Sequence, residues 1–426
     1  MLNKNTLFIL GAGASMDYGF PSGKELLEEI LNILHGYVLF SKKSIDIPGQ
    51  NVRINLNKIF LAHFLGYCFY NLHKTEKSPF EYYKDVELFE GNLTRSNTAS
   101  IDDFISKYSK DNSEYSVIGK ALIALAISEC EVEDRLFYLT KKAENEHRLY
   151  DRLVPASPSS RAKPYISLVN GWYNILWEKL YRQGTVAKNM SKASVITFNY
   201  DRSIEQYLFN SIRGMLKCGE DDATEMMNNI PLMLHRYGQI GILPRKDQSE
   251  SKVNPYKPID KQPFQSWVAS LGGINQPRVT NIETYVNDFL SFNAVANRGL
   301  RKGIDEIFSK LSILIGGIYT YNESDKEISR EIQDDVLATL ERVYFLGFGY
   351  YQENLDNLKF IIEKINKKAV YRGTMMGLTI HRKREVVEWL KDIVGRDHSI
   401  STMKFYEDTP VSDLPISEYL YKVNIE

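Results

Sequence analysis

The stretch that decides the fold is Thr6-Leu7-Phe8-Ile9-Leu10-Gly11-Ala12-Gly13-Ala14-Ser15. Its first five residues are mostly apolar and bounded by glycine, which predicts a short buried strand of a parallel sheet. The next residues carry almost no side chain, and glycine also permits positive φ angles. The N–H groups of such a turn can form an anion-binding concavity for a pyrophosphate. Met16 replaces the third glycine of the dinucleotide pattern G-x-G-x-x-G, so the turn alone is equally well explained by packing.

A helix is expected soon after this turn. Ser22 and Glu25 have the spacing of a capping box, and leucine and isoleucine then recur at helical intervals up to Gly36. Glycine at that place is typical of a helix end. The order is therefore a strand, a small-residue turn, a short link and an amphipathic helix.

A second informative stretch is Ile196-Thr197-Phe198-Asn199-Tyr200-Asp201, at the end of a strand predicted from Ala193. Alternation along an extended chain places Thr197, Asn199 and Asp201 on one face, and directs Phe198 and Tyr200 into packing. An amide and a carboxylate at a strand end are suited to binding a polar ligand. The alternative role of Asp201 is to cap the helix predicted to begin near Ser203.

Two further segments belong with these motifs. Gly347-Phe348-Gly349-Tyr350 follows a predicted strand at residues 342–346, and Asn354 follows closely. This segment is either a ligand-binding turn or an ordinary connection to the next helix, with Asn354 as a cap or a ribose contact. His235 ends another predicted strand, in Leu234-His235-Arg236-Tyr237-Gly238. Ligands of parallel sheets bind at the carboxyl ends of the strands, so the three motifs at 11–15, 198–201 and 347–350 are expected at one edge.

Strands that alternate with helices predict an α/β fold: a Rossmann-like parallel sheet with helices on both faces, interrupted by a large helical insertion. Residues 1–45 and 190–400 are assigned to the nucleotide-binding domain, with an irregular insertion at about 244–330. Within this insertion, residues 244–282 are expected to form a long loop and residues 281–318 to be mostly helical. Residues 46–189 are assigned to the helical insertion, including a loop at 154–160, and residues 401–426 to a C-terminal tail. Within the insertion, Ser100 is expected to cap a helix that contains Asp102 and Asp103.

Composition narrows the class of protein. The 426 residues are 43% apolar and 25% charged, with a formal net charge of −1, which is ordinary for a soluble globular protein and gives no reason to expect nucleic-acid or membrane binding. No segment approaches the ~18 apolar residues that span a bilayer. Cys68, Cys130 and Cys218 are the three cysteines and lie far apart, which fits a reducing, cytoplasmic location.

Together these motifs resemble the nucleotide pocket of the bacterial sirtuin-like (silent information regulator-like) NADases of antiphage defence. The resemblance covers the first forty residues and residues of about 194–243 and 340–380. It rests on Gly-Ala-Gly at 11–13, on the Thr-x-Asn-x-Asp pattern at 197–201 and on the His-x-Tyr-Gly form at 235–238.

The resemblance implies a role for each residue of these motifs. Asn199 would position the nicotinamide ribose and an attacking water, Asp201 would hold the carboxamide, and His235 would be a general base. The cofactor-binding residues would be Gly11, Ala12, Gly13, Ala14, Ser15, Thr197, Gly347, Phe348, Gly349 and Asn354. NAD+ would be the substrate, cleaved to nicotinamide and ADP-ribose, with cyclised ADP-ribose as a side product.

Protein-deacylating sirtuins hold a structural zinc with two CxxC pairs, and this chain has no CxxC. No zinc or other metal is therefore expected, and an acyl-lysine substrate is disfavoured. A module that binds NAD or ADP-ribose without cleaving it is the main alternative. The resemblance further implies an abortive-infection effector, a homo-oligomer, and activation by a partner chain such as a HerA-type ATPase or a short Argonaute.

Overall fold

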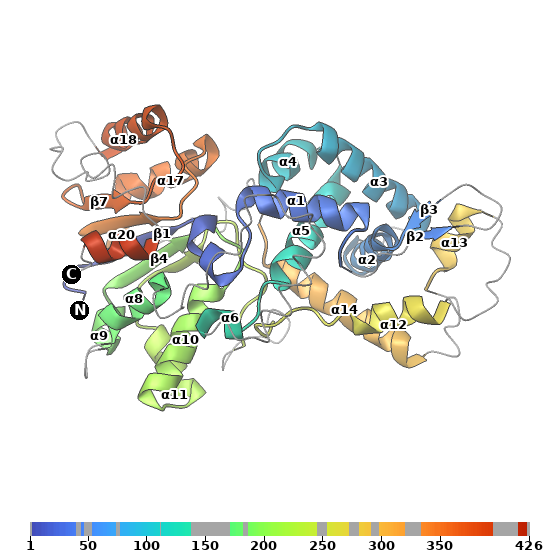
Figure 1. Cartoon of the computed structure of the whole chain (residues 1–426), viewed down its shortest axis with the longest axis horizontal. Helices are drawn as coiled ribbons and strands as arrows, with labels where there is room; N and C mark the ends of the chain where they lie inside the picture. The colour runs from blue at the N-terminus through green and yellow to red at the C-terminus, as the bar shows by residue number, and fades with distance from the viewer. Residues whose placement is uncertain are drawn as a thin grey trace.

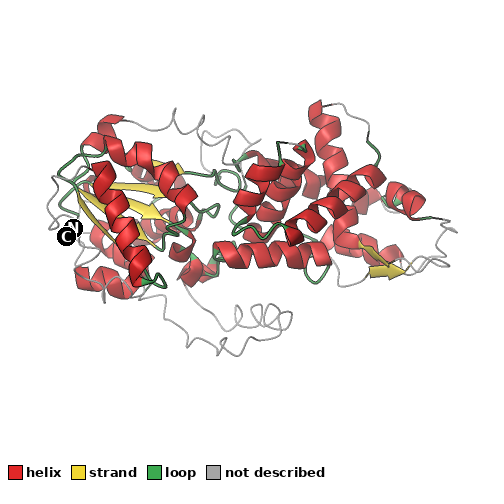
Figure 2. Cartoon of the chain, turned by 90° about the horizontal axis from the view of Figure 1, so that it is seen from above, coloured by secondary structure: helices red, strands yellow, loops and turns green. Residues whose placement is uncertain are grey.

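The computed structural model describes residues 2–39, 44–46, 53–73, 77–110, 112–137, 171–181, 186–244, 254–271, 281–290, 298–319, 334–394 and 416–423. The loop expected at 154–160 lies outside these residues. The described elements form two lobes side by side, one built around a parallel sheet and one of helices (Figures 1 and 2).

The sheet lobe contains five parallel strands in the order β5-β4-β1-β6-β7. They are β1 (Thr6–Leu10), β4 (Ala193–Thr197), β5 (Met233–His235), β6 (Arg342–Leu346) and β7 (Val370–Gly373). All residues of β1 and β4 are buried, which agrees with their mostly apolar sequences. The α/β fold class with an all-parallel sheet is confirmed.

Helices cover both faces of this sheet. Figure 1 shows α17 (Gln352–Lys364) and α18 (Ile380–Val394) on one side, and α8 (Trp172–Leu180), α10 (Ser203–Leu216) and α11 (Glu220–Met227) on the other. The lobe also contains α6 (Asp134–Phe137), α9 (Val186–Met190), α16 (Asp334–Ala338) and α20 (Ile416–Val423). The expected C-terminal tail thus includes a helix, because Ile416, Tyr419 and Leu420 are buried and α20 packs on α8.

The helical lobe is assembled from two distant parts of the sequence. The first part contains α1 (Gly23–His35), β2 (Ser44–Asp46), β3 (Arg53–Asn55), α2 (Leu56–His73), α3 (Pro79–Arg95), α4 (Ile101–Tyr108) and α5 (Ser113–Ser128). The second contains α12 (Gln262–Leu271), α13 (Ile282–Asp288) and α14 (Arg298–Gly316). The two parts pack together through Phe60 of α2. Its ring centroid lies 5.0 Å from that of Phe264 in α12 and 5.2 Å from that of Phe308 in α14.

This arrangement changes the expected boundaries. The long loop predicted at 244–282 is wrong for 262–271, where Phe264 and Trp267 bury one face of α12. The helical structure predicted at 281–318 is confirmed by α13 and α14. Helix α1 packs against α5, in the helical lobe, although its sequence continues directly from the first turn. Helices α8 and α9 lie in the sheet lobe, although the sequence places them within the insertion.

The predicted helix ends are confirmed. Ser22 and Glu25 form the capping box of α1, and Gly36 ends that helix at a φ of 78°. The Ser100 side chain accepts a hydrogen bond from the backbone N–H of Asp103 at the start of α4. Among the helices that the structure describes, none combines the length and apolar character needed to cross a membrane.

Candidate functional site

The motifs from distant parts of the chain meet at the carboxyl edge of the sheet. Register places Leu10 beside Thr197 on one side and Leu346 on the other, and Thr197 beside His235. The strands therefore end level with one another, and the segments that follow them converge. The expected meeting of these motifs is confirmed.

Asn199 occupies the centre of this edge and is held from two directions. Its side-chain Nδ2 donates to the carbonyl oxygen of Gly11 at 3.0 Å and to Ser15 Oγ at 3.1 Å. Its backbone N–H donates to Thr197 Oγ1 at 3.1 Å. The Oδ1 atom is buried and accepts no hydrogen bond from any residue that the structure describes. A buried amide oxygen of this kind is suited to accept a hydrogen bond from water or a ligand hydroxyl.

The glycines of the two turns are required by the contact between the turns themselves. Gly13 N donates to Gly347 O at 3.0 Å, and Gly11 N donates to Leu346 O at 3.1 Å. A Cβ atom on Gly11 would lie 2.6 Å from Gly347 O, and one on Gly347 would lie 2.2 Å from Ala14 N. Gly347 also has a φ of 57°, in the left-handed region. Close packing of β1 against β6 therefore accounts for these small residues without a ligand.

Some backbone groups at the same edge remain able to bind an anion. Residues 12–14 form a short 3-10 turn after β1. Within the described part of the chain, the backbone N–H groups of Ala12, Phe348 and Gly349 donate no hydrogen bond. Such groups at the carboxyl edge of a parallel sheet are typical contacts of a nucleotide pyrophosphate.

The Asp201 carboxylate lies next to this centre and is engaged at the start of α10. Its Oδ1 accepts hydrogen bonds from the backbone N–H and the hydroxyl of Ser203, the former at 3.1 Å. Burial raises the pKa of Asp201, and hydrogen bonds from Ser203 and Ser15 oppose that rise. Asp201 is thus not the N-cap residue of α10, which is Arg202, but from the position before it satisfies the first N–H of the helix. The link through Ser15 brings the same carboxyl group to the Asn199 side.

His235 has both ring nitrogens engaged, which differs from the expected free general base. Nδ1 lies 2.9 Å from the backbone oxygen of Asn199, and Nε2 lies 2.5 Å from Glu205 Oε1. Burial by itself lowers the pKa of His235, but the Glu205 carboxylate and the Asn199 carbonyl more than offset this and raise it above 6.5. In this geometry the ring fixes the backbone of Asn199. Because the raised pKa favours a hydrogen on Nε2, the ring must both lose that proton and leave Glu205 before Nε2 can act as a base.

The other expected ligand contacts are also part of the packing. Phe348 is buried, with its ring centroid 4.9 Å from that of Phe198 in an edge-to-face contact. Asn354 lies in the first turn of α17 and does not cap it. Its Nδ2 donates to Gly349 O at 2.8 Å, and its Oδ1 accepts from Tyr237 Oη at 3.0 Å.

Several residues that sequence patterns did not single out support the site. Glu205 is one, because it contacts His235. An acidic residue in the first turn of a helix is common, so the sequence alone does not indicate that it has a histidine partner. Trp172 is another, with its Nε1 donating to Ala14 O at 2.7 Å. Tyr173 Oη lies 2.6 Å from Ser203 Oγ, which in turn donates to Asp201. Helix α8 thus supports both the first turn and the Asp201 carboxylate.

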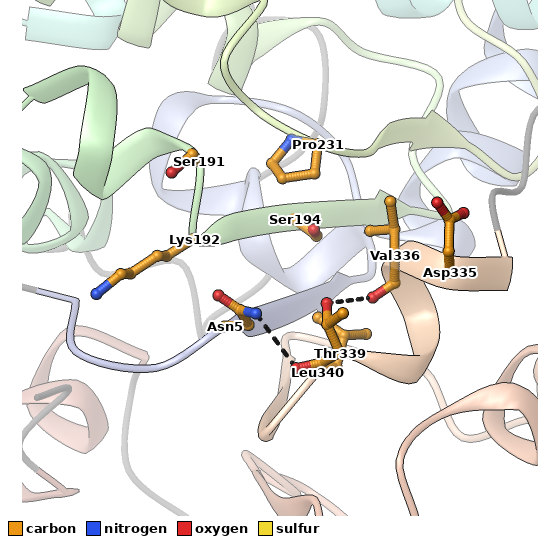
Figure 3. A pocket seen from close by; sticks show the side chains of 9 residues that line it. All are labelled: Asn5, Ser191, Lys192, Ser194, Pro231, Asp335, Val336, Thr339 and Leu340. Atoms are coloured by element: carbon orange, nitrogen blue, oxygen red, sulfur yellow. Dashed lines mark hydrogen bonds between the residues drawn. The ribbon is translucent and has the colours of Figure 1, made fainter.

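A cavity of about 200 Å³ lies at the opposite edge of the sheet, near the amino ends of the strands (Figure 3). Asn5 Nδ2 donates to Thr339 O at 3.3 Å across it. Its lining is Asn5, Ser191, Lys192, Ser194, Pro231, Asp335, Val336, Thr339 and Leu340, and includes none of the site residues predicted from the motifs.

Within the described ranges, no three His, Cys, Asp or Glu residues are grouped so that they could hold a metal ion. Burial raises the pKa of the Cys68 and Cys130 thiols to about 12, so both are neutral thiols near pH 7.

Comparisons of the chain with protein-family models, with curated proteins and with solved structures found no match.

Proposed function

We propose that this chain is an NAD+ glycohydrolase that breaks the bond between nicotinamide and ribose. The observation that carries the proposal is the Asn199 amide. Its nitrogen is held by Gly11 and Ser15, so its buried Oδ1 has a fixed direction and no donor among the described residues. An acceptor fixed in this way can orient a water molecule or a ribose hydroxyl once ligand binding opens the buried Oδ1 to it.

The reaction needs little more than orientation. The C1′–N bond breaks, nicotinamide leaves as a neutral molecule with the bonding electrons, and the ribose becomes an oxocarbenium ion. A water held by Asn199 Oδ1 then bonds to C1′, and its proton passes to solvent. Asp201, at the same edge, would accept a hydrogen bond from the carboxamide, and the N–H groups of Ala12, Phe348 and Gly349 would receive the pyrophosphate.

His235 enters this proposal as the residue that fixes Asn199. Its Nδ1 must carry a hydrogen to bond the Asn199 carbonyl, and Glu205 favours the doubly protonated ring. The Glu205–His235 pair thus sets the backbone on which the proposed water-binding side chain stands. The deacylase alternative is not supported by these contacts, whereas the Thr-x-Asn-x-Asp resemblance supports NAD+ as the substrate.

The second candidate, a module that binds NAD+ without cleaving it, is favoured by one observation. Both ring nitrogens of His235 are engaged with protein groups, so the described geometry offers no free imidazole base. From the resemblance alone we also propose an antiphage, cell-growth-arresting role, a homo-oligomer, and activation by a partner chain of the HerA-type ATPase or short Argonaute class.

Product identification separates these candidates. Wild type, Asn199→Ala and the control Asn229→Ala are incubated with NAD+, and nicotinamide, ADP-ribose and cyclic ADP-ribose are quantified. The control changes a half-buried amide outside the proposed site, whose Nδ2 donates to the backbone oxygens of Glu225 and Met226. We expect cleavage by wild type and control and retained binding without cleavage by Asn199→Ala. Tight binding without cleavage by all three proteins would favour the binding module, and absence of binding would reject both candidates.

A further inference from the structure

Two side-chain contacts join the helical lobe to the segment that carries the proposed NAD+-binding side chains. Tyr200 donates its hydroxyl to Asp102 of α4. Arg202 forms a two-point ion pair with Glu131, which follows α5, with Nε 2.9 Å from Oε1. We call these two contacts the lobe anchors. Tyr200 lies between Asn199 and Asp201, and Arg202 directly follows Asp201, so each anchor holds a neighbour of a proposed site residue.

The Arg202 anchor is fully enclosed. The side chains of Arg202 and Glu131 are both 0% exposed, and Arg202 Nη1 also donates to Asn254 O at 2.6 Å. Removing one member of such a pair leaves an uncompensated buried charge, which water cannot reach without local opening. The position of Arg202 therefore depends on the helical lobe being in place.

A backbone contact completes the connection on the His235 side. Gln239 N donates to Gly317 O, and Tyr319 N donates to Tyr237 O, both at 2.8 Å. The approach is close, because a Cβ atom on Gly238 would lie 2.0 Å from Gly317 O. The end of α14 thus holds the segment that follows β5. The ends of β4 and β5, which carry Asn199, Asp201 and His235, are thus both in contact with the helical lobe.

We infer that Asp102 and Glu131 are positioning residues of the NAD+ site, through which the helical lobe sets the places of Asn199 and Asp201. This inference rests on the proposed function. Neither residue is among the proposed substrate contacts. Successive side chains of residues 199–202 point in alternate directions. Asn199 and Asp201 face the turn that follows β1, whereas Tyr200 and Arg202 face the helical lobe. Displacement of a reacting group by about 1 Å can lower a rate ~100-fold, so loosening of an anchor acts on turnover more than on affinity.

The test compares Asp102→Ala, Asp102→Asn and Tyr200→Phe with Lys107→Ala. The asparagine of Asp102→Asn can still accept a hydrogen bond from the Tyr200 hydroxyl, whereas the alanine of Asp102→Ala cannot. Tyr200→Phe removes only the hydroxyl group. The control breaks the exposed ion pair between Lys107 and Asp103 on the same helix. These variants are used in place of Glu131→Gln, because that substitution would leave the buried Arg202 charge unpaired and lower the stability of the whole protein. Three quantities are measured: amide hydrogen exchange of peptides covering 199–205, kcat for NAD+ cleavage, and Kd for NAD+.

We expect Asp102→Ala and Tyr200→Phe to speed exchange in 199–205 by about tenfold and to lower kcat by at least about tenfold, with Kd changed by less than about twofold. Asp102→Asn should recover most of both losses. Exchange and kcat equal to those of Lys107→Ala, or a change in Kd alone, would overturn the inference. If wild type neither binds nor cleaves NAD+, the proposed function fails, and faster exchange in Asp102→Ala would still show that the anchor positions this segment.

Discussion

The contact between the two glycine turns gives the sharpest prediction of stability, through Gly347→Ala. Alanine at a φ of 57° costs about 1 to 2 kcal/mol because its Cβ crowds the following carbonyl. The new Cβ would also lie 2.2 Å from Ala14 N and 2.3 Å from Gly13 C, both backbone atoms that cannot rotate away. The turns must separate, and the hydrogen bonds Gly13 N–Gly347 O and Gly11 N–Leu346 O are lost or lengthened. At about 1 kcal/mol for each bond, the free energy of unfolding should fall by about 3 to 4 kcal/mol in all.

Gly377→Ala is the matched control. Gly377 has a φ of 81°, but apart from its two chain neighbours no described residue has an atom within 4 Å of the position that a Cβ would take. This variant should lose only the backbone contribution of about 1 to 2 kcal/mol. Urea unfolding, followed by circular dichroism and by the fluorescence of the buried tryptophans, measures both variants. Equal destabilisation of Gly347→Ala and Gly377→Ala would refute the account in which the turns require glycine for their mutual contact. Weaker NAD+ binding by Gly347→Ala alone would link the same contact to the site.

Three other perturbations have outcomes that the contacts determine. Asn199→Ala should lower NAD+ cleavage by at least about 100-fold with little change in binding, as quantified by nicotinamide release and calorimetry; comparable rates would remove Asn199 from the mechanism. Glu205→Gln should remove the stabilisation that the Glu205 carboxylate gives to the protonated His235 ring. Because the folded-state pKa of His235 is raised above 6.5, the wild-type protein has this stabilisation in full below about pH 6.5 and loses it as pH rises through the raised pKa. The difference in unfolding free energy between wild type and Glu205→Gln should therefore shrink toward alkaline pH, and a difference that grows would contradict the assignment. Trp172→Phe should lower stability by about 1 to 3 kcal/mol, since the Ala14 carbonyl loses its buried donor, and unchanged urea midpoints would show that this bond contributes nothing.

The strands and turns could be predicted because their signals are local. Buried parallel strands such as Thr6–Leu10 are short apolar runs bounded by glycine, and the helix caps at Ser22 and Ser100 are read within four residues. The common edge could be predicted because each motif follows the carboxyl end of a parallel strand, and in the structure Asn199 and Ser15, from two of these motifs, are in contact.

The lobes and the supporting residues depend on contacts between distant segments. Asp102 and Tyr200 are 98 residues apart, and nothing around Asp102 except its place near a helix start distinguishes it from a solvent-exposed carboxylate. Helix α1 is amphipathic, but its sequence does not say whether its apolar face meets the sheet or α5. The role of the glycines was also ambiguous, because a close backbone neighbour and a ligand phosphate both require the absence of a Cβ.

The central claim is that NAD+ binds at the carboxyl edge of the sheet, with its nicotinamide ribose against residue 199. A crystal structure of Asn199→Ala, which should bind NAD+ without cleaving it, tests this claim most directly. The account predicts the nicotinamide ribose beside residue 199, the carboxamide at Asp201 and the pyrophosphate at the N–H groups of Ala12 and Phe348. NAD+ bound instead in the cavity at the amino edge, beside Asn5 and Lys192, would contradict it.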